Sequence, residues 1–72
     1  MYAVVEARGN VVLGVTLHDT HIDAINRACD MADENGLCQT DEAKQNVLDG
    51  LGSQGYYRSG DYRVTVIEAT QP

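Results

Sequence analysis

Residues 2–7 and 11–17 are rich in β-branched and other apolar residues, which predicts two β-strands near the N-terminus. Gly9 and Asn10 lie between them and suit the central positions of a type II′ turn, in which glycine takes the positive φ. The two segments therefore predict an antiparallel hairpin. In the register that this turn sets, the side chains expected to face the core are those of Tyr2, Val4, Leu13, Val15 and Leu17.

The next two segments repeat apolar residues at the three- and four-residue spacing of amphipathic helices. The first helix is expected over about His21–Asn35 after a capping Thr20, and the second over about Asp41–Leu51 after Thr40. The stripes expected to face inward are Ile22, Ile25, Ala28, Cys29 and Ala32 in the first helix, and Ala43, Val47, Leu48 and Leu51 in the second.

The C-terminal third of the chain predicts more of the sheet. The glycine-rich segment 50–55 is expected to end the second helix. Tyr56–Asp61 predicts a short strand and a turn, and Tyr62–Ala69 predicts a strand with alternate residues inward from Tyr62. We therefore expect one α+β domain over residues 1–72, of the order ββααβ(β). Its antiparallel sheet has three or four strands, with both helices packed on one face.

The other face of this sheet is expected to carry small side chains that are mostly apolar. It is expected to carry Ala3, Val5, Ala7, Val12, Thr16, Thr65 and Ile67. Left uncovered, such a face is an interaction surface or a dimer interface. Scattered exposed apolar residues are also normal on monomers, so the sequence leaves both interpretations open.

Composition narrows the classes of partner. The chain has 72 residues, is 43% hydrophobic and carries a net charge of −6 with only five Lys and Arg. This charge repels bare nucleic acid and anionic membranes, and it favours a basic protein as partner. No leader-like segment and no apolar run of about 20 residues occurs. We therefore expect a cytoplasmic protein with reduced thiols.

Three motif-like patterns lack the context that their chemistry needs. The GxGxxG pattern at 50–55 follows a helix, whereas a dinucleotide-binding loop precedes one. The calcium-loop-like segment 31–42 begins with Met31, whose thioether is a poor ligand for a hard cation. His18 and His21 could begin a metal site, but Cys29 lies two helical turns beyond His21, about 12 Å away. We expect no metal and no cofactor.

Nucleophilic catalysis is not expected either. A catalytic thiol needs an electropositive setting that lowers its pKa. Cys29 is expected to be buried, and the sequence neighbours of Cys38 are acidic, which raises the pKa of a thiol. A chain this short also offers little room for a substrate pocket. We therefore expect a binding protein and not an enzyme.

The strongest indication of function is the concentration of acidic residues on the two predicted helices. The two predicted helices carry seven carboxylates, and only Arg27 and Lys44 offset them. The residues expected to contact a basic partner are Asp23, Asp30, Asp33, Glu34, Asp41 and Glu42. Tyr57 and Arg58, beside the glycine-rich segment, are expected to add an aromatic and basic anchor. A helix face that is merely solvated is the alternative.

The hairpin at Tyr2–Leu17 and the acidic helix at His21–Asn35, in a short single-domain chain, resemble small phage-encoded inhibitors, the anti-CRISPR proteins among them. Those proteins share no common motif, so no residue role carries over. The resemblance implies a non-catalytic inhibitor in the host cytoplasm. It would block a CRISPR effector complex by placing carboxylates on basic residues that hold DNA or guide RNA.

Two other classes stay open beside this leading hypothesis of an acidic inhibitor that contacts protein, and neither nucleic acid nor membrane directly. One is an assembly module that forms a homodimer through the free sheet face or an edge strand. The other is a metal-regulated switch that uses His18, His21 or the Asp33–Glu42 loop.

Overall fold

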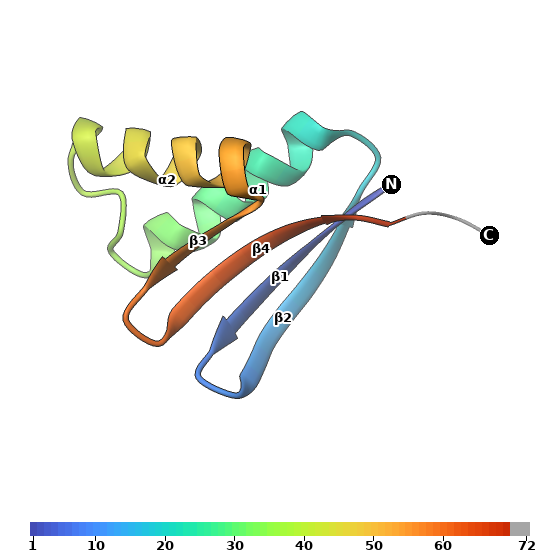
Figure 1. Cartoon of the computed structure of the whole chain (residues 1–72), viewed down its shortest axis with the longest axis horizontal. Helices are drawn as coiled ribbons and strands as arrows, with labels where there is room; N and C mark the ends of the chain where they lie inside the picture. The colour runs from blue at the N-terminus through green and yellow to red at the C-terminus, as the bar shows by residue number, and fades with distance from the viewer. Residues whose placement is uncertain (70–72) are drawn as a thin grey trace.

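A computed structural model, which describes residues 1–69, confirms the α+β class and the single sheet (Figure 1). The elements follow the order ββααββ, so the sheet has the fourth strand that the sequence left open. They are β1 (Tyr2–Arg8), β2 (Val11–His18), α1 (His21–Glu34), α2 (Asp41–Gln54), β3 (Tyr56–Ser59) and β4 (Tyr62–Glu68).

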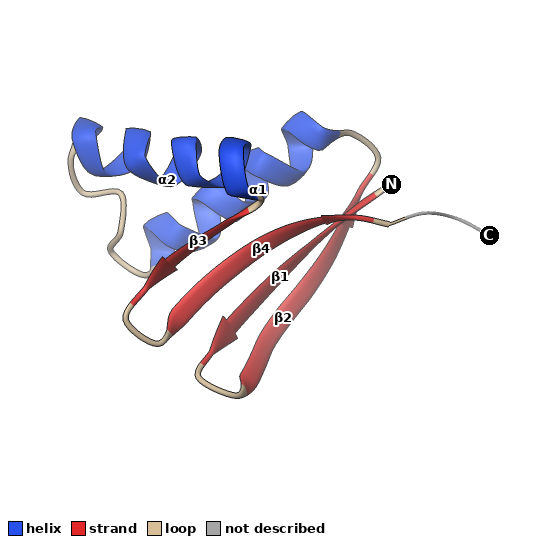
Figure 2. Cartoon of the chain, in the orientation of Figure 1, coloured by secondary structure: helices blue, strands red, loops and turns tan. Residues whose placement is uncertain are grey.

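The four strands form one antiparallel sheet in the order β2-β1-β4-β3, so the first and last strands of the chain pair at its centre. Both helices lie on one face of this sheet, as predicted (Figure 2). α1 packs over β1 and β4, and α2 lies against β3. Within residues 1–69 no helix covers the opposite face. The fold therefore has two layers, with its core between them.

The turn between β1 and β2 has the predicted form. Gly9 has a φ of 60°, and Asn10 has no positive φ, which is the combination of a type II′ turn. Arg8 pairs with Val11 directly beside this turn. The hairpin therefore starts in the register expected from the sequence.

A β-bulge then shifts that register by one residue. Glu6 pairs with Gly14 and not with Leu13, which is the extra residue of the bulge. Because side chains alternate between the two faces of a strand, the shift directs each later side chain of β2 to the face opposite the expected one. The prediction that Leu13, Val15 and Leu17 face the core is therefore wrong.

The core lies between the helices and the central strands. Its largest fully buried side chains are those of Val4, Val47, Leu51 and Val64. Tyr62 is only 3% exposed, and β4 directs alternate residues inward from Tyr62, as predicted. The two central strands thus pack against α1, whereas α2 packs against β3 and α1.

α1 approaches the sheet through small side chains. Ala24, Ala28 and Ala32 are completely buried, and they recur at the four-residue spacing of one helix face. Ile22 was predicted for the inward stripe but is 68% exposed. The prediction failed there because the three alanines, and not the bulkier isoleucine, define the side of α1 that fits closely against β1 and β4.

α2 extends beyond its predicted end and stops at Gly55, whose φ of 82° is left-handed. Gly50, expected to break the helix, lies inside it and allows α2 to approach β3. A Cβ atom at Gly50 would lie 3.2 Å from the carbonyl oxygen of Tyr56 and 3.2 Å from the ring of Tyr57. A Cβ atom at Gly52 would meet nothing within 4 Å.

A polar network ties the end of α1 to the sheet. The Oε2 atom of Glu6 accepts hydrogen bonds from the Tyr62 hydroxyl at 2.6 Å and from Asn35 Nδ2 at 3.2 Å. Arg8 donates to Asn35 Oδ1 at 3.3 Å and pairs with Asp61 at 2.9 Å. Burial and the bond to Glu6 raise the pKa of Tyr62, so its hydroxyl remains a donor. Because Asn35 caps α1, this network positions the helix end over β1 and β4.

Alanine at Gly52 is expected to stabilise the fold by about 0.5–1 kcal/mol, because alanine favours the helix and the new methyl group meets open space. Alanine at Gly50 gives the same gain in helix propensity, but its methyl group would lie too close to the backbone oxygen of Tyr56. We expect the Gly50→Ala variant to be less stable than Gly52→Ala by about 1 kcal/mol or more. Urea unfolding measures both, and equal free energies of unfolding would contradict the close approach of α2 to β3.

Candidate protein-binding surfaces

The sheet face opposite the helices, here named the open face, is largely apolar, and no helix of residues 1–69 covers it, although Ala7 on this face is only 6% exposed. By strand pairing it carries Ala3, Val5, Ala7, Val12, Val15, Leu17, Tyr56, Arg58, Arg63, Thr65 and Ile67. The sequence predicted most of this set, but it placed Thr16 here in error. The bulge exchanges Thr16 for Val15 and Leu17, which makes the open face more apolar than predicted.

Beyond the bulge, β2 carries its apolar side chains on the side away from the core. Thr16 and His18 point toward the helix layer, where the Thr16 hydroxyl and His18 Nε2 lie 2.8 Å apart. Val15 and Leu17 point to the open face and are 56% and 63% exposed. An antiparallel strand with one solvated face normally directs its apolar residues to the core. The pattern of β2 therefore suits burial on the open side.

Sequence reasoning missed Val15 and Leu17 as surface residues, although one signal was present. Gly14 interrupts a strand rich in β-branched residues, and a lone glycine in a strand is typical of a bulge. A bulge at this point reverses the facing of every residue after it. The exposed apolar pair on β2 follows from that single feature.

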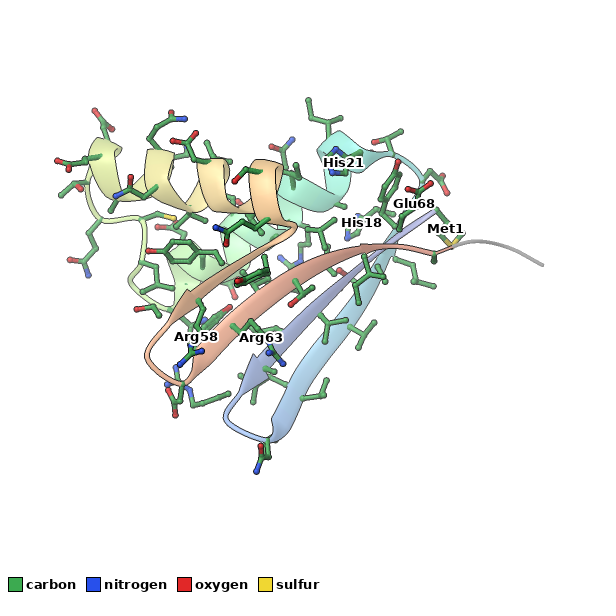
Figure 3. All side chains as sticks on the ribbon, in the orientation of Figure 1. Met1, His18, His21, Arg58, Arg63 and Glu68 are labelled. Carbon is green, nitrogen blue, oxygen red and sulfur yellow. The ribbon has the colours of Figure 1, made fainter. Side chains whose placement is uncertain are left out.

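Two arginines border the open face at its β3–β4 corner (Figure 3). Arg58 and Arg63 are cross-strand partners, and the figure shows both far from the end of the sheet that holds His18. Neither arginine forms an ion pair with a carboxylate of residues 1–69. With Val5, Tyr56, Thr65 and Ile67 they line a hollow of about 410 Å³.

Tyr57 and Arg58, the anchor expected from the sequence, direct their side chains to opposite faces of β3, as neighbouring residues of a strand do, but both line a hollow of about 470 Å³ at the edge of the sheet. Tyr57 is half-buried against the core, on the helix side of β3. Arg58 is exposed on the open face, where Tyr56, 41% exposed, accompanies it instead. The pairing of β3 with β4 places Arg63 beside Arg58 on this face.

The predicted acidic residues gather only in part. Asp30 and Asp33 of α1 and Asp41 of α2 line one cleft of about 510 Å³ between the helices. Lys44 lines the same cleft and offsets part of their negative charge. Asp41 also lies in the first turn of α2, where the helix dipole favours an anion. We name this feature the acidic cleft.

The other three predicted acids do not line the acidic cleft. Asp23 lies in the first turn of α1, and Glu42 lies in the first turn of α2. Glu34, at the end of α1, comes within 3.9 Å of Arg27. The acidic cleft is therefore the part of the predicted contact surface whose carboxylates line a common cleft.

Both cysteines line the acidic cleft as free thiols. The Cys38 thiol donates a long hydrogen bond, 3.9 Å, to the backbone oxygen of Cys29. Burial first, and then the neighbouring Cys29 and Asp33, raise the pKa of Cys38 to about 11. A thiol in this state is a poor nucleophile near neutral pH, which agrees with the expectation from its acidic neighbours.

The histidines lie at the end of the sheet where Met1 and Glu68 are found (Figure 3). The His21 ring packs against the ring of Tyr2 with centroids 5.1 Å apart, and His18 contacts a threonine hydroxyl. Among the side chains of residues 1–69, no three of His, Cys, Asp and Glu are close enough to hold a metal ion.

No protein-family model matches this chain, and neither does any curated protein or solved structure. Across residues 1–69, neither helix has the length and apolar character needed to cross a membrane. Function is therefore inferred from the surfaces themselves.

Cys38 is expected to react slowly with iodoacetamide at pH 8. A pKa raised from 9.0 to about 11 lowers the thiolate fraction roughly a hundredfold. Mass spectrometry of the alkylated peptides gives the rate for Cys38 separately from that for Cys29. The same chain unfolded in urea is the control and should react at the rate of an ordinary thiol. A rate at Cys38 that is unchanged by unfolding would contradict the shielded thiol.

Proposed function

We propose that this chain is a non-catalytic protein-binding module and that the open face is its principal contact surface. The observation that carries the proposal is the direction of Val15 and Leu17, which point away from the core. Completing the burial of each contributes roughly 1–2 kcal/mol. A partner that covers both, together with their neighbours on β1 and β4, gains affinity from several such contributions.

The composition of the open face supports contact with a protein. Its centre is aliphatic, and its β3–β4 corner adds Tyr56, Arg58 and Arg63. Tyrosine and arginine beside a desolvated apolar centre are the residue types that dominate binding energy at protein interfaces. The hollow at this corner opens onto the same apolar sheet face, so a protein segment that lies on that face can reach it.

The edge of the sheet adds to the same surface. β2 is an edge strand among the described residues, and its eight residues include no Lys, Pro, Asp or Glu. Exposed edges usually carry such residues, which discourage association with other strands. Apart from the bulge at Leu13, β2 has none of these protections, so its edge supports the same proposal.

Leu17→Glu tests the open face directly. The Leu17 side chain is 63% exposed, so the substitution should leave the fold intact, while a carboxylate in the apolar contact should weaken partner binding at least about tenfold. Ile22→Glu is the matched control, because Ile22 is 68% exposed but belongs to the helix layer.

The measurement is recovery of bound proteins by each variant from lysate of cells that make the chain, with circular dichroism to confirm folding. Equal recovery by the Leu17→Glu and Ile22→Glu variants would refute the open face as the contact surface. Sedimentation of the chain alone distinguishes the assembly module: a dimer that Leu17→Glu dissociates would make a second copy the partner.

A second candidate function is the acidic inhibitor, and the gathering of Asp30, Asp33 and Asp41 around one cleft supports it. Three carboxylates in a cleft concentrate negative potential and attract Lys or Arg of a basic protein or nucleoprotein. A CRISPR effector complex is the example that the resemblance implies. The acidic cleft and the open face lie in different layers of the fold, so the two contacts do not compete for the same surface.

Asp30→Asn combined with Asp33→Asn is expected to slow association with such a basic partner and to reduce its salt dependence, because exposed charges are screened over about 10 Å at 0.1 M salt. Asp23→Asn combined with Glu42→Gln is the control of equal charge outside the cleft. Stopped-flow or biosensor association rates from low to high salt measure the effect. An on-rate that does not change with salt would exclude the electrostatic contact.

A further inference from the structure

We infer that the segment which covers the open face belongs to another protein and carries a carboxylate beside its apolar side chains, and that Arg58 and Arg63 bind this carboxylate. The inference rests on the proposed function and names the chemistry of the partner. The occupant is an acidic, amphipathic segment of a different protein.

Arg58 and Arg63 form a cationic pair with no carboxylate of residues 1–69 at ion-pairing distance, although Asp61, which pairs with Arg8, lines a neighbouring hollow with both. They lie directly opposite each other on antiparallel strands, where like charges destabilise a sheet. Arg58 donates one hydrogen bond, from Nε to the backbone oxygen of Gly60 at 3.3 Å. Arg8 and Arg27, by contrast, each have a carboxylate partner. A carboxylate placed between the two open-face guanidinium groups would remove their repulsion.

The surroundings of the pair suit a ligand group with a charged end and an apolar end. The two arginines share their hollow with Val5 and Ile67. Guanidinium donors bind a carboxylate through paired hydrogen bonds, while the aliphatic walls accept its hydrocarbon stem. From this hollow the apolar surface continues across β1 to β2. The acidic residue of the partner therefore belongs at the β3–β4 corner, and its apolar residues lie toward β2.

The distribution of charge favours a single carboxylate over a polyanion. All eleven Asp and Glu side chains lie on the helices, in turns, or on the helix side of the sheet. Arg58 and Arg63 are thus the only charged residues of the open face in residues 1–69. Two cations are few for a phosphate backbone, and the net charge of −6 repels one.

A second copy of the chain fits this surface poorly. Two open faces packed against each other would enclose four arginine side chains and no carboxylate from either face. Buried charges that lack a partner of opposite sign are costly. The open face therefore favours a partner that supplies the missing negative charge.

The test uses two synthetic probes. One is an amphipathic helical peptide of about five turns with leucines on one face and glutamates bordering them, since helices commonly cover sheet faces. The other has glutamine in place of every glutamate. Isothermal titration calorimetry compares their affinities for the folded chain. The overall negative charge of the chain opposes the glutamate peptide, so a preference for it must arise at local cations.

We expect the glutamate peptide to bind at least tenfold more tightly than the glutamine peptide. The double variant Arg58→Gln, Arg63→Gln should abolish this preference. The double variant Arg27→Gln, Lys44→Gln is the matched control, because it removes the same charge from the helix layer and should retain the preference. Leu17→Glu should weaken both peptides, since it disrupts the apolar contact that they share.

Four results would overturn the inference. Equal affinities of the two peptides, both weakened by Leu17→Glu, would refute the carboxylate anchor and leave the proposed function standing. Absence of binding by either peptide would refute both. A stable dimer that Leu17→Glu dissociates would make a second copy the occupant. A single-stranded oligonucleotide that binds more tightly than the glutamate peptide, and that requires Arg58 and Arg63, would make the ligand a nucleic acid.

Discussion

The β-bulge at Leu13 is the constraint on which the rest of this structure depends. β1 lies at the centre of the sheet and β2 pairs with it along its whole length. One extra residue in β2 therefore decides which side chains face the helices. It sends Thr16 and His18 toward the helix layer and exposes Val15 and Leu17. The exposure of these two side chains supports the proposed contact surface.

The two layers of the fold differ sharply in their charge. The helices hold most of the carboxylates, whereas the charged groups of the open face are Arg58 and Arg63 in the part of the chain that the structure describes. Although the net charge of the chain is −6, the charge is distributed unevenly between the two layers. Electrostatic arguments about its partners must be made for each face separately.

The side chains that could most readily take part in a reaction are engaged in structural contacts instead. Glu6 and Tyr62 hold the end of α1 on the sheet, and the Cys38 thiol is shielded and bonded to a backbone oxygen. These contacts stabilise a small core built around four large aliphatic side chains and a row of alanines. The apolar residues left on the open face contribute little to that core, and their exposure supports the proposed contact with another molecule.

Local patterns in the sequence determined the strands, both helix starts at Thr20 and Thr40, the type II′ turn and the inward side of β4. Each depends on the conformational preference of a few adjacent residues, so it can be predicted without knowing the fold. The facing of β2 beyond Gly14 depends instead on its pairing with β1, the passage of α2 through Gly50 depends on its packing against β3, and the burial of the alanine side of α1 depends on strands that include the distant β4. The same holds for the sites: the sequence identified Asp30, Asp33 and Arg58, but only strand pairing placed Arg58 beside Arg63, and only helix packing gathered the aspartates into one cleft. Contacts between distant segments are a property of the tertiary structure, because their energy comes from packing that no short stretch of chain contains.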